Sequence, residues 1–254
     1  MRETSEQTIL LPSGAVRRGH TVPALKTFRN CNNSDTLCCV GLRETKKLRT
    51  RQEIADKAMQ LFARRGFDRV TVAEVAAAAK VSEKTVYNYF PTKEDLFFDE
   101  VPARRAALVD AIRGRRPGES IGAALQRLQV AECPRLSSPG FAVFARIIEE
   151  SPALRAKELE VMVQFTDVLA GEIERELGVD PRDARIAANM LVSVHWQFFR
   201  NARKQALAGK YGPAAAKRLK ADLVRAYGLL EHGLAALEPG TVATGATEAG
   251  GRTR

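Results

Sequence analysis

The stretch from Val70 to Leu96 constrains the fold more than any other part of the chain. Its capping residues and apolar positions predict a helix, a tight turn, a second helix, and a third helix that follows a proline. Two short helices joined by a turn of about 3–4 residues form the geometry that places one helix in the major groove of DNA. The second helix carries polar and aromatic side chains that suit phosphates and base edges: Ser82, Lys84, Thr85, Tyr87, Asn88 and Tyr89.

Capping residues mark the helix starts in this region. Thr71 begins a Thr-x-x-Glu capping box, and Ser82 and Thr92 precede the next two helices. Upstream, apolar residues at helical spacing predict a core-facing helix that Gly66 closes in a left-handed conformation. This stripe consists of Ile54, Ala55, Ala58, Leu61 and Phe62. A three-helix helix-turn-helix domain over residues 43–95 is the prediction.

The rest of the chain is expected to be helical, because no segment alternates convincingly at period two. The predicted fold class is all-α, with a larger helical domain over residues 96–237 and a disordered, low-complexity tail over 238–254. Turn formers beside helix-initiating residues predict the helix breaks. These lie at 115–120, 134–140, 151–152, 178–181 and 209–213.

Residues 1–42 show no helical or strand periodicity, and three interpretations remain open for them. They form a disordered arm, or translation begins near Val40, or they add phosphate contacts through basic residues, which is the least favoured. The first two of these interpretations both place residues 1–42 outside the fold. Cys31, Cys38 and Cys39 with His20 lack the ligand spacing of a zinc site, so neither a metal nor a cofactor is expected.

Composition favours a polyanionic partner, since 40 Lys and Arg against 30 Asp and Glu give a formal net charge of +10. The chain has no apolar run of about 18 residues, and Ile9-Leu10-Leu11 is too short for a signal-peptide core. A cytoplasmic protein without a membrane partner is therefore expected. No glycine-rich phosphate loop, GxSxG or HExxH motif is present, so the sequence predicts no enzyme.

The run from Ala76 to Leu96 resembles the N-terminal signature of the tetracycline-repressor (TetR) family of bacterial regulators. The matching residues are Val81-Ser82, Thr85-Val86-Tyr87, Phe90 and Lys93-Glu94, with Leu61-Phe62, Gly66-Phe67 and Thr71-Val72 upstream. The resemblance implies a homodimeric repressor that a small-molecule effector releases from a near-palindromic double-stranded DNA operator. It also implies that the larger domain binds the effector and dimerises. An activator of the same fold and a charge-driven, non-specific DNA-binding protein are the alternatives.

The sequence predicts eight DNA-contacting residues: Thr71, Ser82, Lys84, Thr85, Tyr87, Asn88, Tyr89 and Lys93. Val81, Val86 and Phe90 should face the core, which turns the polar positions of the same helix outward. Thr85 and Tyr87 suit thymine methyls or phosphates, and Asn88 suits adenine. Packing is an equal alternative for Tyr89, and the phosphate contact of Lys93 follows from the resemblance alone.

Two basic features, one inside this element and one upstream of it, have more than one interpretation. Lys80 stands in the turn where the family usually has glycine, and a left-handed conformation there costs about 1 kcal/mol more for lysine. The turn either tolerates that strain or takes another shape, and the ammonium could add a phosphate contact. Upstream, a basic run is either a solvated surface or a lead-in to the adjacent groove. It comprises Arg43, Lys46, Lys47, Arg49 and Arg51.

The last two helices are expected to form the dimer interface. The first of these two helices carries apolar residues on two faces: Ile186, Met190 and Val194 on one, and Val192, Trp196 and Phe199 on the other. The last helix carries one apolar stripe, which consists of Leu219, Leu223, Tyr227, Leu230, Leu234 and Leu237. The candidate effector-binding residues are Phe144, Met162, Phe165, His195, Trp196 and Phe199, with Phe141, Arg146, Gln164 and Gln197 beside them. Ordinary core packing is the favoured alternative for this group. Residues 200–225 contain eight Lys or Arg and one Asp, which favours a solvated surface over an anion site.

Overall fold

The computed structural model describes residues 35–232 of the chain, with side chains from Thr45 to Glu231. Ten helices and no strand occur in this range, which confirms the all-α fold class. The helices are α1 (Asp35–Arg65), α2 (Val72–Ala78), α3 (Glu83–Tyr89), α4 (Lys93–Phe97), α5 (Val101–Arg113), α6 (Ile121–Leu136), α7 (Pro139–Glu150), α8 (Pro152–Leu177), α9 (Pro181–Leu207) and α10 (Pro213–His232). None of these helices is long and apolar enough to cross a membrane.

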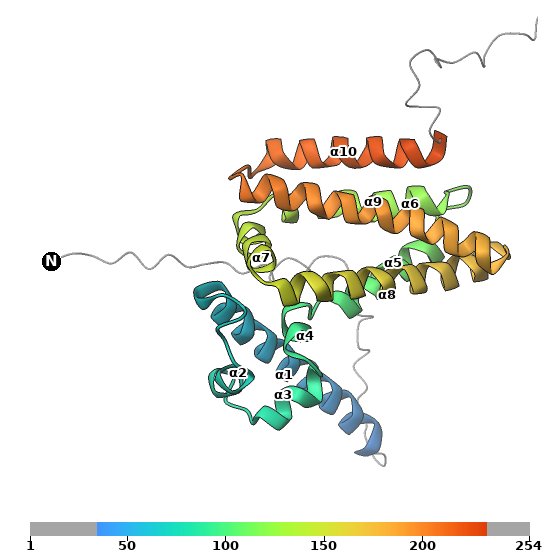
Figure 1. Cartoon of the computed structure of the whole chain (residues 1–254). Helices are drawn as coiled ribbons and strands as arrows, with labels where there is room; N and C mark the ends of the chain where they lie inside the picture. Colours follow the sequence, from blue (N-terminus) through green and yellow to red (C-terminus); the bar gives the residue numbers. More distant parts are fainter. Residues whose placement is uncertain (1–34, 233–254) are drawn as a thin grey trace, which may run out of the picture.

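The helices form two packed units, which we call the head (α1–α4) and the body (α5–α10) (Figure 1). The head core is built on the predicted α1 stripe, of which Ile54, Ala58 and Phe62 are fully buried. This head cluster also takes in Ile147, Ile148 and Leu154 from α7 and α8. Head and body therefore share apolar packing across their junction.

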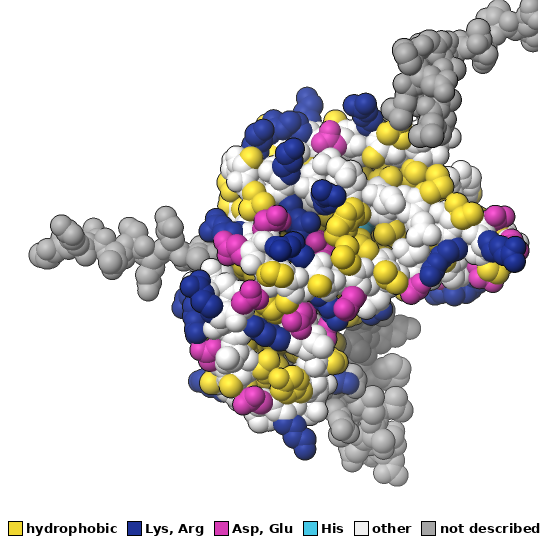
Figure 2. All heavy atoms as spheres, viewed as in Figure 1, with side chains coloured by type: hydrophobic (Ala, Val, Ile, Leu, Met, Phe, Trp, Pro, Cys, Tyr) yellow, Lys and Arg dark blue, Asp and Glu magenta, His cyan; other side chains and the backbone are white. Residues whose placement is uncertain are grey.

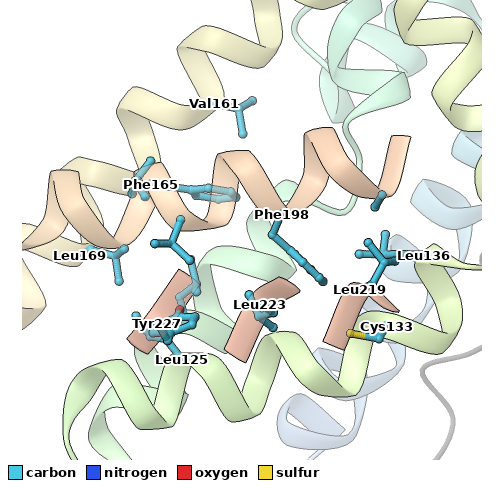
Figure 3. Close-up of a cluster of buried hydrophobic side chains, with 14 of the residues drawn as sticks. Leu125, Cys133, Leu136, Val161, Phe165, Leu169, Phe198, Leu219, Leu223 and Tyr227 are labelled. Carbon is cyan, nitrogen blue, oxygen red and sulfur yellow. The ribbon is translucent and has the colours of Figure 1, made fainter. Parts of the chain in front are cut away.

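The body core is formed by side chains of α6, α8, α9 and α10, which meet in the cluster drawn in Figure 3. Leu219, Leu223 and Tyr227 of α10 are buried against side chains of α6 and α9, and the Tyr227 hydroxyl accepts a hydrogen bond of 2.9 Å from Gln129. The predicted stripe of the last helix thus packs inside its own subunit. Its two final members, Leu234 and Leu237, lie outside the described residues.

Helix α1 begins at Asp35, earlier than the predicted domain start at residue 43. Residues 45–49 are helical yet exposed, so this end of the helix carries no apolar stripe from which its start could be recognised. Backbone hydrogen bonds and good helix formers extend a helix without burial. The remainder of the predicted N-terminal extension, with His20 and Cys31, lies outside the described residues, as do the side chains of Cys38 and Cys39 and the predicted tail over 238–254.

The helix that begins at Lys93 does not run on into the body. Helix α4 ends at Phe97, residues 98–100 form a turn, and α5 begins at Val101. Pro102 occupies the first turn of α5, where its missing N–H is harmless; in a continuous helix it would clash with the preceding turn. Head and body are therefore joined by a turn.

The other predicted breaks occur where turn formers were recognised. Helix α7 starts at Pro139, α8 at Pro152, α9 at Pro181 and α10 at Pro213. The break at 134–140 is narrower than predicted, because α6 keeps Pro134 inside its last turn and ends at Leu136.

Candidate nucleic-acid interface

Helix α2 begins with the predicted capping box. The hydroxyl of Thr71 accepts a hydrogen bond of 3.2 Å from the Glu74 backbone N–H, and the Glu74 carboxylate accepts one of 2.8 Å from the Thr71 N–H. The guanidinium of Arg65 also donates to Glu74 at 2.6 Å. These hydrogen bonds, from the Thr71 backbone first and Arg65 next, lower the pKa of Glu74 to about 2. The box is consequently ionised and closed at neutral pH.

The turn between α2 and α3 takes the first of the two alternatives considered for Lys80, since this residue is left-handed with φ of 56°. The backbone N–H groups of Lys80 and Val81 donate to the carbonyls of Ala77 and Ala76 at 3.2 and 3.0 Å. These bonds close the end of α2 in the manner of a left-handed helix cap. Lysine therefore occupies a conformation that favours glycine.

Helix α3 is oriented by its buried side and by its cap. Val86 and Phe90 are each only 1% exposed and face the head core. The Ser82 hydroxyl accepts a hydrogen bond of 3.1 Å from the Thr85 N–H and pairs with the Thr85 hydroxyl at 2.8 Å. The side of α3 that faces away from the core is thereby fixed.

That outer side carries three of the predicted contact residues at helical spacing. Lys84, Tyr87 and Asn88 are exposed and stand at positions i, i+3 and i+4, so they share one face. Tyr87 leaves 49% of its surface in solvent, which is unusual for a large aromatic side chain. Figure 1 places α3 on the side of the head that faces away from the body. Figure 2 shows basic side chains at the outer margin and lower tip of the head.

The other predicted contact residues are placed differently. Thr71 and Ser82 are exposed at the starts of α2 and α3, and Thr85 is half-buried through its hydroxyl pair with Ser82. Tyr89 is half-buried and packs against the head core, in keeping with the packing alternative. The sequence-predicted set thus divides into exposed and partly buried members.

Lys93 does not join the exposed group. Its Nζ donates a hydrogen bond of 2.7 Å to the Phe67 carbonyl and lies 4.2 Å from the centroid of the Phe67 ring. Burial lowers the pKa of its ammonium. The Lys93 ammonium therefore binds the loop that follows α1. Sequence spacing around Lys93 does not indicate this contact, because Phe67 is distant in sequence.

Arg51 has a structural role that the sequence did not indicate, since it was counted with the basic run. Its guanidinium donates to the carbonyl oxygens of Asp99 at 3.0 Å and Tyr89 at 3.4 Å, and lies 4.2 Å from the centroid of the Phe90 ring. Arg51 therefore ties α1 to the end of α3 and to the 98–100 turn. The available signal was its position three residues before Ile54, on the core side of α1.

The head meets the body through specific contacts as well as through apolar packing. The Ser151 hydroxyl, at the start of α8, donates to the carboxylate of Asp68 at 2.8 Å. Lys157 of α8 lies 3.3 Å from a carboxylate oxygen of Asp95 in α4. The rings of Phe97 and Phe144 stack with centroids 4.6 Å apart. These contacts couple the orientation of the head to α7 and α8.

Within the body, the structure brings together part of the predicted effector-binding group. The ring of His195 lies 5.6 Å from Phe165 and 4.8 Å from Phe199, measured between centroids. The Arg104 guanidinium lies 5.4 Å from the Phe199 centroid. Burial, with a smaller effect of Arg104, lowers the pKa of His195 to about 3, so the imidazole is neutral. Its Nδ1 is buried and has no hydrogen-bond partner among the described residues.

The remaining predicted effector residues lie at the margins of this aromatic group. Met162 is half-buried against the body core, and Phe144 stacks on Phe141 and on Phe97 of the head. Trp196 is half-buried and does not belong to the body cluster. The polar residues predicted beside this group do not gather around His195: Arg146 is exposed, Gln197 donates to Asn201, and Gln164 lines a cleft beside the head.

A helix-turn-helix head with an exposed polar face on its second helix, joined to a larger helical body, defines a class of DNA-binding transcriptional regulators. Residues 54–99, which lie in the head and the turn after it, match the family model of bacterial regulatory proteins of the tetR family.

Individual relatives agree with this assignment. The chain is 28% identical over 151 residues to the HTH-type transcriptional regulator TcmR of Streptomyces glaucescens, covering 56% of this chain and 67% of TcmR. It is 50% identical over 54 residues to the HTH-type transcriptional regulator LuxR of Vibrio harveyi, covering 21% of this chain and 26% of LuxR. Both relatives are described as transcriptional regulators. The second match spans only about a quarter of LuxR.

A solved structure was also compared with the chain. The TetR-family repressor FadR of Thermus thermophilus, in complex with lauroyl-CoA, has 26% sequence identity and a TM-score of 0.44. The comparison covers 79% of this chain and 100% of FadR.

Proposed function

We propose that this regulator is a homodimeric repressor that occupies a near-palindromic operator and is released by a small molecule. The exposed face of α3 carries the proposal, because Lys84, Tyr87 and Asn88 are held outward by the buried Val86 and Phe90. Such a face offers a cation for phosphate or guanine, an aromatic ring for a thymine methyl, and an amide for adenine. The exposed hydroxyls of Thr71 and Ser82 add phosphate partners beside it. A DNA partner places the protein in the cytoplasm.

A second copy of the chain is needed to read two half-sites about 34–36 Å apart. The surface of α9 supports such a partner, since Ile186 and Met190 lie one turn apart and are 59% and 46% exposed. On α10, Val224 is 47% exposed. We place the dimer interface on these outer faces of α9 and α10, in a four-helix arrangement.

The effector site is proposed around His195, where Phe165 and Phe199 supply apolar walls and the unpaired Nδ1 supplies a polar group. Release follows if the effector prefers a body conformation whose two heads no longer match the half-site spacing. Because α4 ends at Phe97, the signal must pass through the junction contacts as well as along the chain. The pair of Ser151 and Asp68 is one such contact.

The test is a selection of bound fragments from random and genomic DNA by the full-length chain at physiological salt. We expect one palindromic sequence to be enriched. The Tyr87→Ala variant should bind that sequence more weakly by about 1–3 kcal/mol, because it loses a base or phosphate contact on the outer face of α3. The matched control is Tyr211→Ala, at an exposed tyrosine before α10.

Two outcomes would contradict the proposal. A stable wild-type dimer that enriches no sequence would indicate binding by charge alone, which also predicts a steep dependence on salt. Equal affinities of wild type, Tyr87→Ala and Tyr211→Ala for the selected site would show that the outer face of α3 does not read DNA.

A further inference from the structure

A second candidate ligand site lies at the junction of head and body, apart from the aromatic group around His195. It is a half-open cleft with a volume of about 240 Å³. Its head side is formed by α1, the end of α3 and α4, and its body side by α5 and α8. None of Phe165, His195 and Phe199 lines it.

The walls of the cleft combine apolar and cationic chemistry. Tyr89, Phe90 and Phe98 line it from the head, and Val101 and Val161 line it from the body. Three cations, Arg51, Arg105 and Lys157, and one carboxylate, Asp95, also line it. The cleft therefore carries an excess of positive charge beside surfaces that suit an aromatic or aliphatic group.

Most of the charged groups in the cleft already have partners. Arg51 donates to backbone carbonyls of the head, and Lys157 lies 3.3 Å from both Asp95 and Glu160. Arg105 differs, because its guanidinium makes no hydrogen bond, ion pair or ring contact with any residue that the structure describes, although the side chain is half-buried. The amide of Gln164 is likewise without a partner among the described residues.

We propose that this cleft binds a small organic anion, with a carboxylate carried on an aromatic or short aliphatic group. Arg105 of α5 pairs with the carboxylate through two parallel N–H donors, and the Gln164 amide of α8 donates from the adjacent wall. The volume lies below the range of roughly 300–1,000 Å³ that drug-sized ligands occupy, so the ligand is of the size of a benzoate. This site is additional to the proposed effector site in the body.

The location of the cleft gives the ligand a regulatory role. Its walls come from both units, so a bound anion contacts the head and the body together. Binding therefore favours the head orientation in which both walls are in place. The ligand acts on the junction directly, whereas a ligand at His195 must act through the body.

The test uses benzoate as the probe and benzamide as its neutral analogue, with the full-length chain. We expect calorimetry to show binding of benzoate and weaker binding of benzamide. In methyl-labelled protein, the resonances of Val101 and Val161 should shift, while those of Val192, a buried residue of α9 that does not line the cleft, should not. Arg105→Gln should weaken benzoate binding by roughly tenfold or more, because it removes a charge-assisted pair.

Control variants separate the site from general charge effects. Arg116→Gln, at an exposed arginine in the loop after α5, should leave benzoate binding unchanged. Gln164→Met keeps the length of the side chain but removes the amide, and should weaken binding less than Arg105→Gln does. Equal effects of Arg105→Gln and Arg116→Gln, absence of benzoate binding, or shifts confined to Val192 would overturn the proposal. No readout uses DNA, so the operator-binding proposal stands or fails separately.

Discussion

At the scale of single residues, Lys80 shows how a local conformation and a residue type can conflict. Its φ of 56° is the only positive value among non-glycine residues in the described part of the chain. Lys80→Gly should raise the free energy of unfolding by about 0.5–1 kcal/mol, because glycine adopts this conformation without steric strain. Chemical denaturation followed by circular dichroism measures the change.

Lys84→Gly is the matched control for Lys80→Gly. Lys84 is exposed within α3, so the same substitution should lower stability there by about 0.5–1 kcal/mol. Two changes of the same chemistry, a few residues apart, are expected to have opposite signs. A loss of stability in Lys80→Gly would show that the turn is not strained.

Asp99, in the turn between α4 and α5, makes stability depend on pH. Burial and the neighbouring Glu100 raise its pKa from 3.8 to about 6. The folded state therefore binds a proton that the unfolded state releases between these values, so stability falls as pH rises from about 4 to 6. Asp99→Asn should remove this part of the pH dependence and stabilise the protein at pH 7 by about 1–3 kcal/mol.

Urea denaturation of wild type and Asp99→Asn at several pH values checks this expectation. The difference in unfolding free energy between Asp99→Asn and wild type should be near its minimum at pH 4 and reach its full size above pH 6. Asp110→Asn, at an exposed position in α5, serves as the control. A difference between wild type and Asp99→Asn that stays constant over this range would be inconsistent with a raised pKa.

At the scale of helices, α8 and α9 are joined by an ion pair in an almost dry environment. Arg203 donates to both carboxylate oxygens of Glu158 at 3.0 and 2.8 Å, and the two side chains are only 13% and 11% exposed. Burial raises the pKa of Glu158 even beside this guanidinium. Glu158→Leu should lower stability by about 3–5 kcal/mol, because Arg203 is left charged and unpaired.

The double variant Glu158→Leu with Arg203→Met separates the loss of charge pairing from the loss of packing. It should recover most of the stability, since two apolar side chains can replace a buried pair. Glu160→Leu, at an exposed residue of the same helix, should change stability by less than about 1 kcal/mol. Thermal unfolding of the three variants distinguishes these cases. Equal losses in the single and double variants would show that the pair is not a coupled unit.

The features that the sequence predicted correctly are local ones. Thr71, Ser82 and Thr92 cap helices through residues only three positions away, and Gly66 ends α1 as its position indicated. Such interactions depend on neighbouring residues, so a short window of sequence contains their cause. The outward face of α3 was predictable for the same reason, because Val86 and Phe90 set its buried side.

The features that were missed depend on tertiary contacts. Lys93 and Arg51 have long side chains whose partners, Phe67 and Asp99, are distant in sequence. Spacing alone cannot choose between solvent, DNA and a backbone carbonyl as the destination of a flexible cation. The break between α4 and α5 has a local cause, because Pro102 suits the first turn of a helix and not its interior.

At the scale of the whole molecule, the proposed dimer can be tested without knowledge of the operator. Sedimentation equilibrium should show a wild-type dimer and a monomer for the double variant Ile186→Lys with Met190→Lys, because two charges would enter an apolar contact. Leu48→Lys introduces the same charge at an exposed leucine of α1 and should remain dimeric. A dimeric double variant would place the interface elsewhere.

The apolar cluster shared between head and body determines whether either unit can be produced as a separate fragment. Ile147, Ile148 and Leu154 complete the head core from the far side of the junction. An isolated head that stops at residue 100 would leave the apolar surface they cover open to water, and would lose the stabilisation of that burial. An exchange of DNA-binding specificity between regulators of this kind should therefore replace the exposed residues of α3 within the intact chain, and not exchange whole heads at the turn between the two units. We expect the two units to unfold together, because each covers apolar surface of the other.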